Sequence, residues 1–202
     1  MSRELSNPLQ SLIAGAAKSL PAATGDTARF RARVEGAGAG VVILADVSSS
    51  MDERAGRRRK CEILAEALDQ LWPELAGARL IAFGATAAEV LSPDDLPAPS
   101  GGTALHLALD AAARPAPAKT VVISDGRPDS EEAALAAAGR LPGLIDVIYC
   151  GPDSDAQAIA FMGRLARLGA GRVWVRDVVR DSTLQLGPVI RATLGLPAPR
   201  GV

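Results

Sequence analysis

Asp46, Ser48 and Ser50 follow directly on an apolar run and could together bind a cation. The run from Val41 to Ala45 has the length and composition of a buried strand, so Asp46 is expected at the strand's end. A carboxylate and two hydroxyls at alternate positions supply the oxygen donors that hard cations such as Mg²⁺ prefer. Each serine alone could simply cap the following turn. Only the combination favours a metal site.

Two further oxygen-bearing residues are expected at the same edge of the predicted sheet. Asp125 ends a second apolar run, and Thr103 follows a Ser-Gly-Gly sequence at a predicted helix start. In the strand order common to doubly wound sheets, the strands ending at Asp46 and Asp125 are neighbours where the winding reverses. Their carboxylates then face one crevice, where repulsion raises a pKa and a divalent cation relieves it. Thr103 could add an oxygen ligand, or it could serve as the N-cap of its helix.

The elements that position these residues alternate between strands and helices. Helical spacing recurs between the strand-like runs, and a short segment, 88–92, is predicted to pair at an edge with the strand before it. This alternation predicts an α/β fold with a doubly wound, mostly parallel, Rossmann-like sheet, strand order 3-2-1-4-5-6, and helices on both faces. The predicted strands are 41–46, 78–84, 119–126, 144–151 and 171–178, and the predicted helices are 61–75, 103–114, 130–141, 155–169 and 182–196.

Residues 1–36 stand apart from this alternation. They contain an apolar stripe typical of an amphipathic helix and a possible extra strand at 28–34, and the Gly-rich segment 35–40 is interpreted as a hinge. We therefore expect an N-terminal extension, residues 1–36, and one main domain, residues 37–202.

Composition narrows the class of protein. Of the 202 residues 48% are hydrophobic, which predicts a packed core. The formal net charge is −1, so we expect no bulk attraction to nucleic acid or an acidic membrane. Two cysteines and one histidine are too few for a zinc cluster, and Cys61 and Cys150 are interpreted as buried thiols in a reducing compartment. The sequence has no apolar run of membrane-spanning length and no signal-peptide pattern, so a cytoplasmic location is expected.

Three other functions compete with metal-dependent binding as interpretations of the sequence. A dinucleotide-binding domain is disfavoured because the Gly-rich segment 36–40 precedes its strand instead of following it. The basic run 56–60 is interpreted as a solvated helix start rather than a nucleic-acid patch, although it is also placed to steer an acidic partner. A metal-dependent hydrolase or phosphoryl-transfer enzyme using the same carboxylates stays open as the alternative. His106, the one histidine, is interpreted as a helix-surface residue, and no G-x-S-x-G elbow is present.

Three short motifs, taken together, resemble one family. The sequences DVSSS (46–50), SGGTAL (100–105) and SDGRP (124–128) resemble, in the same order, the metal-binding motifs of von Willebrand factor type A domains. The similarity covers residues 40 to 196. Carried over by position, it implies a metal-ion-dependent adhesion site made of Asp46, Ser48, Ser50, Thr103 and Asp125.

This resemblance implies a function as well as a fold. It implies an intracellular, Mg²⁺-dependent protein-binding module rather than an enzyme, with Mn²⁺ or Ca²⁺ as alternative ions. The expected partner is another protein that supplies a Glu or Asp to the metal. An adaptor role in a multi-protein system, such as an ATPase-linked, stress-resistance or anti-phage assembly, follows from the same resemblance, with an ATPase or another component as the partner.

Overall fold

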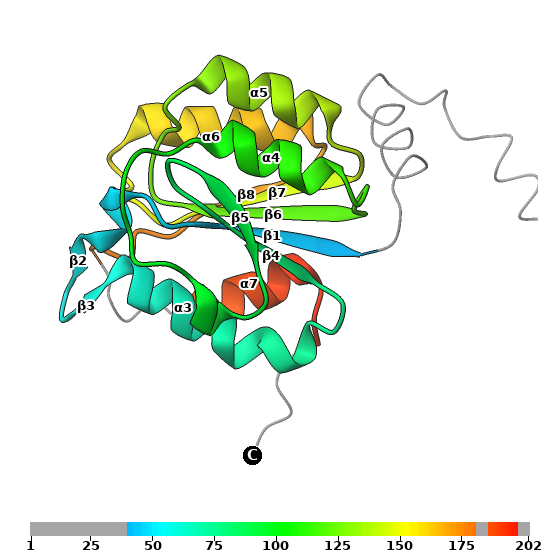
Figure 1. Ribbon diagram of the computed structural model, residues 1–202. Helices are drawn as coiled ribbons and strands as arrows, with labels where there is room; N and C mark the ends of the chain where they lie inside the picture. Colours follow the sequence, from blue (N-terminus) through cyan, green and yellow to red (C-terminus); the bar gives the residue numbers. More distant parts are fainter. Residues whose placement is uncertain (1–39, 181–185, 198–202) are drawn as a thin grey trace, which may run out of the picture.

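A six-stranded sheet forms the centre of the computed structural model, which describes residues 40–180 and 186–197 (Figure 1). Neighbouring strands are parallel except β5, which pairs antiparallel with β4 at one edge. Numbered along the chain within this sheet, the order is 3-2-1-4-5-6, so the doubly wound topology and the edge hairpin are both confirmed. From one edge to the other the strands are β5 (Ala87–Val90), β4 (Arg79–Phe83), β1 (Val41–Asp46), β6 (Lys119–Ser124), β7 (Leu144–Tyr149) and β8 (Val173–Val175).

Helices cover both faces of the sheet, as the alternating sequence pattern predicts. One face packs against α4 (Leu105–Ala113), α5 (Glu131–Arg140) and α6 (Ala156–Leu168), and the other packs against α3 (Lys60–Leu71) and α7 (Leu186–Leu194) (Figure 1). Successive residues of β1 therefore enter different cores: Leu44 packs on the α4 side and Ile43 on the α3 side. Burial on both faces explains why β1 and β6 are nearly continuous apolar runs.

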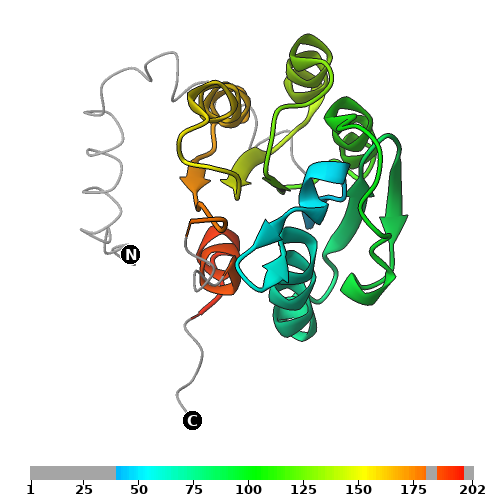
Figure 2. The same ribbon diagram turned by 90° about the vertical axis from the view of Figure 1, so that its left-hand side faces the viewer.

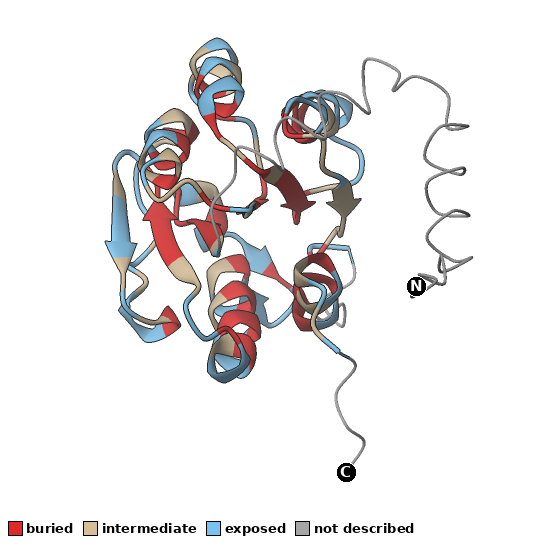
Figure 3. Ribbon diagram, turned by 90° about the vertical axis from the view of Figure 1, so that its right-hand side faces the viewer, coloured by how far each residue is buried: buried red, intermediate tan, exposed pale blue. Residues whose placement is uncertain are grey.

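The core is built largely from small and aliphatic side chains, because the sequence holds few aromatic residues. Alanines make the buried face of α5, and this allows that helix to lie close to its neighbours. Figure 3 shows this burial in the central strands and on the inner faces of the helices, with exposed residues on the outer faces.

Several predicted boundaries shift in the structure. The helix predicted at 61–75 ends at Leu71, and a short 3-10 turn, η2 (Trp72–Glu74), replaces its last part because Pro73 cannot continue an α-helix. The helix predicted at 103–114 begins at Leu105, and the last strand is shorter than 171–178. A two-stranded hairpin that the sequence did not predict, β2 (Arg54–Ala55) with β3 (Arg58–Arg59), lies between the first strand and α3 along the chain. Two further 3-10 turns are η1 (Ser49–Asp52), which precedes this hairpin, and η3 (Pro93–Asp95), which follows β5.

Three further expectations from the sequence have different outcomes. The predicted extension, residues 1–36, lies outside the described residues. Both cysteines are free, but Cys150 alone is buried and Cys61 is half-buried, so the expectation of two buried thiols is wrong for Cys61. Within 40–180 and 186–197, no helix is long and apolar enough to span a membrane.

Candidate metal site

The carboxyl ends of β1 and β6 lie side by side, which brings the predicted site together. The two strands are parallel and hydrogen-bonded, with Ala45 opposite Ile123. Asp46 is the last residue of β1, and Asp125 directly follows the last residue of β6. Both carboxylates therefore emerge at the same edge of the sheet, as the strand order requires.

Asp46 is fully buried and has no cationic partner among the described residues. Its Oδ1 accepts a hydrogen bond of 2.8 Å from the Ser48 backbone N–H, and its Oδ2 accepts one of 2.5 Å from the Ser124 hydroxyl. Burial raises the pKa of Asp46 to about 6, although the hydrogen bonds from Ser124 and Ser48 oppose this rise. Repulsion from Asp125 adds the smallest contribution to the Asp46 pKa. Desolvation, and not the repulsion expected from the sequence, is therefore the main cause of the raised Asp46 pKa.

The two serines connect Asp46 to Asp125. The Ser48 and Ser50 hydroxyl oxygens are 3.1 Å apart, and the Ser50 hydroxyl donates a 2.7 Å hydrogen bond to Asp125 Oδ1. The 3-10 turn η1 fixes this arrangement, because Met51 is buried beneath it and its backbone N–H bonds to Ser48 O at 3.0 Å. Four of the five predicted ligands thus form one hydrogen-bonded cluster.

Thr103 reaches the same edge of the sheet through its backbone. The Ser49 N–H donates a 3.1 Å hydrogen bond to Gly101 O, which ties the threonine loop to the serine loop. The N-cap of α4 is Ala104, so the interpretation of Thr103 as a helix cap is wrong. Its backbone N–H is held by the Asp129 carboxylate, with both oxygens at 3.0 Å. Its hydroxyl makes no hydrogen bond with any residue that the structure describes, and it is therefore available to a ligand.

Lys60 is a member of the site that sequence reasoning missed. Its side chain is only 2% exposed, and its Nζ lies 2.6 Å from Asp125 Oδ2 and 2.6 Å from Glu53 Oε2. The interpretation of 56–60 as a solvated helix start is therefore wrong for Lys60, whereas the three arginines before it are exposed. The helical spacing contained a signal, since Lys60 precedes Ile63 and Leu64 by three and four positions on the buried face of α3.

The donor set suits a hard divalent cation. Asp46 is a buried carboxylate without a cationic partner among the described residues, and Thr103 offers a hydroxyl that makes no hydrogen bond with any of them. The described residues contain no cluster of three or more His, Cys, Asp or Glu side chains that could hold a metal, so binding here depends on the serine and threonine oxygens. Carboxylate and hydroxyl oxygens fit Mg²⁺ or Mn²⁺ better than a softer metal.

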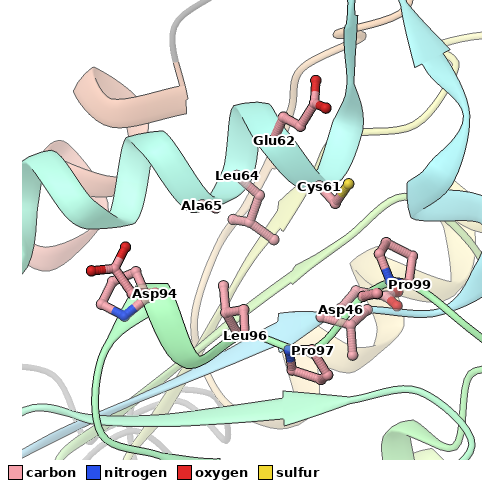
Figure 4. A pocket seen from close by; sticks show the side chains of 12 residues that line it. Asp46, Cys61, Glu62, Leu64, Ala65, Asp94, Leu96, Pro97 and Pro99 are labelled. Carbon is pink, nitrogen blue, oxygen red and sulfur yellow. The ribbon is translucent and has the colours of Figure 1, made fainter.

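An apolar pocket of about 310 Å³ adjoins the site. It lies between α3 and the proline-rich loop that follows η3, and Asp46 lies near its Pro97–Pro99 end (Figure 4). Cys61 and Leu64 line the side formed by α3. The pocket leaves apolar surface next to the carboxylate of Asp46.

Comparison with known proteins supports the fold but not a family assignment. No protein-family model and no curated protein sequence matches the chain. An aerotolerance-related membrane protein from Bacteroides fragilis is 19% identical, with a TM-score of 0.56 over 78% of this chain and 99% of that one. BatB from Bacteroides thetaiotaomicron is also 19% identical, with a TM-score of 0.53 over 78% of this chain and 100% of BatB.

A third solved structure is manganese-loaded TRAP from Plasmodium vivax, 17% identical with a TM-score of 0.52 over 77% of this chain and 74% of that one. Identities this low establish the arrangement of helices and strands alone. The fold is a von Willebrand factor A-like α/β fold.

Proposed function

We propose that this chain is a metal-dependent protein-binding module whose cation, Mg²⁺ or Mn²⁺, receives a carboxylate from a partner protein. Asp46, Ser48, Ser50 and Thr103 supply the oxygens that hold the ion, and Asp125 orients Ser50. One observation carries the proposal: four of the five residues form a hydrogen-bonded cluster at the strand ends, and the Ser49 N–H bond to Gly101 O ties the threonine loop to this cluster.

The chemistry of the donors favours binding over turnover. Three hydroxyls add oxygens without adding negative charge, so a bound cation keeps much of its attraction for an anion. Bound there, the ion supplies an electrophilic position that a Glu or Asp side chain fills by displacing water. The apolar pocket beside Asp46 offers surface for the partner residues that flank such a carboxylate.

The proposal extends to the setting in which the module works. An adaptor role within a multi-protein assembly, with an ATPase or another component as the partner, follows from the family resemblance. A cytoplasmic location is proposed from the sequence pattern alone. Among structures of the same fold, TRAP is manganese-loaded, which agrees with a divalent ion at the strand ends of this chain.

Calorimetric titration with Mg²⁺ and Mn²⁺ tests the metal site. Asp46→Ala should abolish binding, and Thr103→Val should weaken it because the hydroxyl is replaced by a methyl group of similar shape. Thr120→Val is the matched control, since Thr120 is buried in β6, and the site does not include its side chain. Equal metal affinity in the Asp46→Ala variant and the unmodified protein would refute the site.

A second experiment tests the function itself. Partner capture from the native source, in Mg²⁺ and in EDTA, should depend on the ion and fail in the Asp46→Ala variant. Changing the captured partner's contact carboxylates to amides should weaken binding, because a neutral amide competes poorly with water for the cation. Metal-dependent turnover of phosphoester or ester substrates, lost in Asp46→Ala, would instead support the hydrolase alternative.

A further inference from the structure

Asp125 is already neutralised by the protein. Its side chain is 1% exposed, its Oδ2 accepts a hydrogen bond from the Lys60 ammonium at 2.6 Å, and its Oδ1 accepts one from Ser50 at 2.7 Å. Both carboxylate oxygens therefore have donors, and one of these donors carries a full positive charge. Asp46 differs, since its donors are a neutral hydroxyl and a neutral amide.

The position of Lys60 is fixed by the fold. The residue starts α3, its backbone N–H bonds to Glu53 O at 3.1 Å, and the hairpin formed by β2 and β3 lies immediately before it. Figure 2 shows this hairpin, in cyan, next to the start of α3. A buried ammonium held by helix and hairpin cannot turn away into solvent as a surface lysine does.

The contact between Lys60 and Asp125 changes the total charge around a bound ion. A divalent cation with two free carboxylates is neutral overall, but the Lys60 ammonium adds a positive charge at 2.6 Å from one of them. Among the described residues the one other acidic partner of Lys60 is Glu53, whose side chain is 64% exposed and which therefore compensates the buried ammonium only in part. The loaded site retains excess positive charge.

We propose that Lys60 is a specificity-determining residue of this site: it keeps Asp125 from neutralising the cation, which weakens metal binding and strengthens selection of an anionic ligand. This inference rests on the proposed function, because it assumes that the oxygens around Asp46 hold a metal. It gives the basic residue at the start of α3 a role that is separate from the exposed arginines of the hairpin.

Metal titration of Lys60 variants tests the inference. Removal of the ammonium in Lys60→Met should increase affinity for Mg²⁺ and Mn²⁺ by at least about tenfold, because an opposing charge a few ångströms away is lost. Glu53→Gln should act in the opposite direction and lower the affinity about two- to threefold, because it leaves Lys60 less compensated. A variant that merely damaged the site would bind metal more weakly, so the direction of the Lys60→Met change separates the two explanations.

Two further variants provide a second test and a control. Lys60→Gln keeps a hydrogen-bond donor next to Asp125 without the charge, and it should show the same gain even if Lys60→Met does not fold. Arg57→Met removes a positive charge from the exposed hairpin and should leave metal affinity within about twofold, because solvent screens that charge.

Acetate provides the readout for anion selection. With Mn²⁺ bound, acetate that displaces a metal-bound water lowers the relaxation rate of water protons. The unmodified protein should respond at an acetate concentration at least about fivefold lower than Lys60→Gln does, since it offers more excess charge.

The outcomes separate this inference from the function on which it rests. If the unmodified protein binds metal and the Lys60 variants bind it equally well, the role of Lys60 is refuted and the metal-dependent function stands. If neither the unmodified protein nor any Lys60 variant binds metal, the proposed function itself fails. Tighter metal binding with weaker acetate binding in both Lys60 variants supports the inference.

Discussion

The Ser124 hydroxyl donates a 2.5 Å hydrogen bond to Asp46 Oδ2 and so joins the ends of β1 and β6. Together with the Ser48 backbone N–H, it gives both oxygens of a fully buried carboxylate a neutral donor. Neutral donors hold the carboxylate in place but leave its charge uncompensated. This arrangement makes the metal-free protein sensitive to pH.

Asp46→Asn should therefore stabilise the metal-free protein increasingly as pH rises from 4 to 7. Burial raises the pKa of Asp46 from 3.8 to about 6, so protonation of Asp46 favours the folded state. In the unmodified protein, the stabilisation that comes from protonating Asp46 is full below pH 3.8 and is lost as pH rises through 6. Asparagine is neutral at every pH and does not lose it. The shift corresponds to about 3 kcal/mol of unfolding free energy. Urea denaturation in EDTA at a series of pH values measures the difference between the two proteins.

Saturating Mg²⁺ provides the control for that experiment. The ion should stabilise the unmodified protein at pH 7 but not Asp46→Asn, because it binds the ionised carboxylate of the folded state alone. A constant stability difference between the two proteins from pH 4 to 7 in EDTA would contradict the assignment of the raised pKa to Asp46.

The sequence predicts those residues of the site that end strands, but not the contacts between residues far apart in the chain. The carboxylates and hydroxyls were predictable because Asp46 and Asp125 end apolar runs, and a doubly wound sheet places such ends together. The pairing of Lys60 with Asp125 crosses 65 positions of sequence. It depends on a hairpin whose strands have two residues each, too short for any periodicity to reveal.

Ser124 and Asp129 were missed for a similar reason. The sequence places Ser124 within an apolar strand, and its contact with Asp46 follows only from the register of β1 and β6. Asp129 lies in a loop, and it contacts Thr103 because the two loops leave the sheet at the same edge. Loop-to-loop contacts of this kind leave no pattern in hydrophobic spacing.

Thr120→Val should stabilise the protein by about 1 kcal/mol. Thr120 is fully buried in β6, and its hydroxyl has no hydrogen-bond partner among the described residues. Valine has nearly the same shape, favours strands, and removes the cost of desolvating a hydroxyl. Denaturant midpoints of the two proteins measure the change. A loss of stability in the variant would show that the hydroxyl is paired in solution.

Asp146→Ala should destabilise the protein by about 3 kcal/mol, since it leaves an ammonium without its buried partner. Asp146 in β7 is 4% exposed, its Oδ2 lies 2.9 Å from Lys119 Nζ, and its Oδ1 accepts a 2.8 Å hydrogen bond from the Arg172 backbone N–H. Thermal melting measures the loss, with Asp110→Ala as the control because Asp110 forms an exposed ion pair with Arg140. Equal losses in the two variants would contradict the role assigned to burial.

Gly102→Ala should lower metal affinity about tenfold while costing less than about 1 kcal/mol of stability. A Cβ at position 102 would lie 2.5 Å from Asp129 Oδ2, a contact that the carboxylate can relieve only by moving away. Because this carboxylate holds the Thr103 backbone N–H, its displacement loosens the loop that presents the Thr103 hydroxyl. The stability cost stays small, since the clash is with the far end of an exposed, flexible side chain.

Calorimetry with Mn²⁺ and denaturation in EDTA measure the two effects of Gly102→Ala separately. Asp129→Ala should reproduce the loss of affinity, because it removes the same hydrogen bonds without adding a methyl group. Gly126→Ala is the control, since a Cβ at that position of the neighbouring loop meets nothing within 4 Å. If Gly102→Ala and Asp129→Ala both bind metal like Gly126→Ala, the Asp129 carboxylate does not position Thr103, and the threonine is not a ligand whose placement matters.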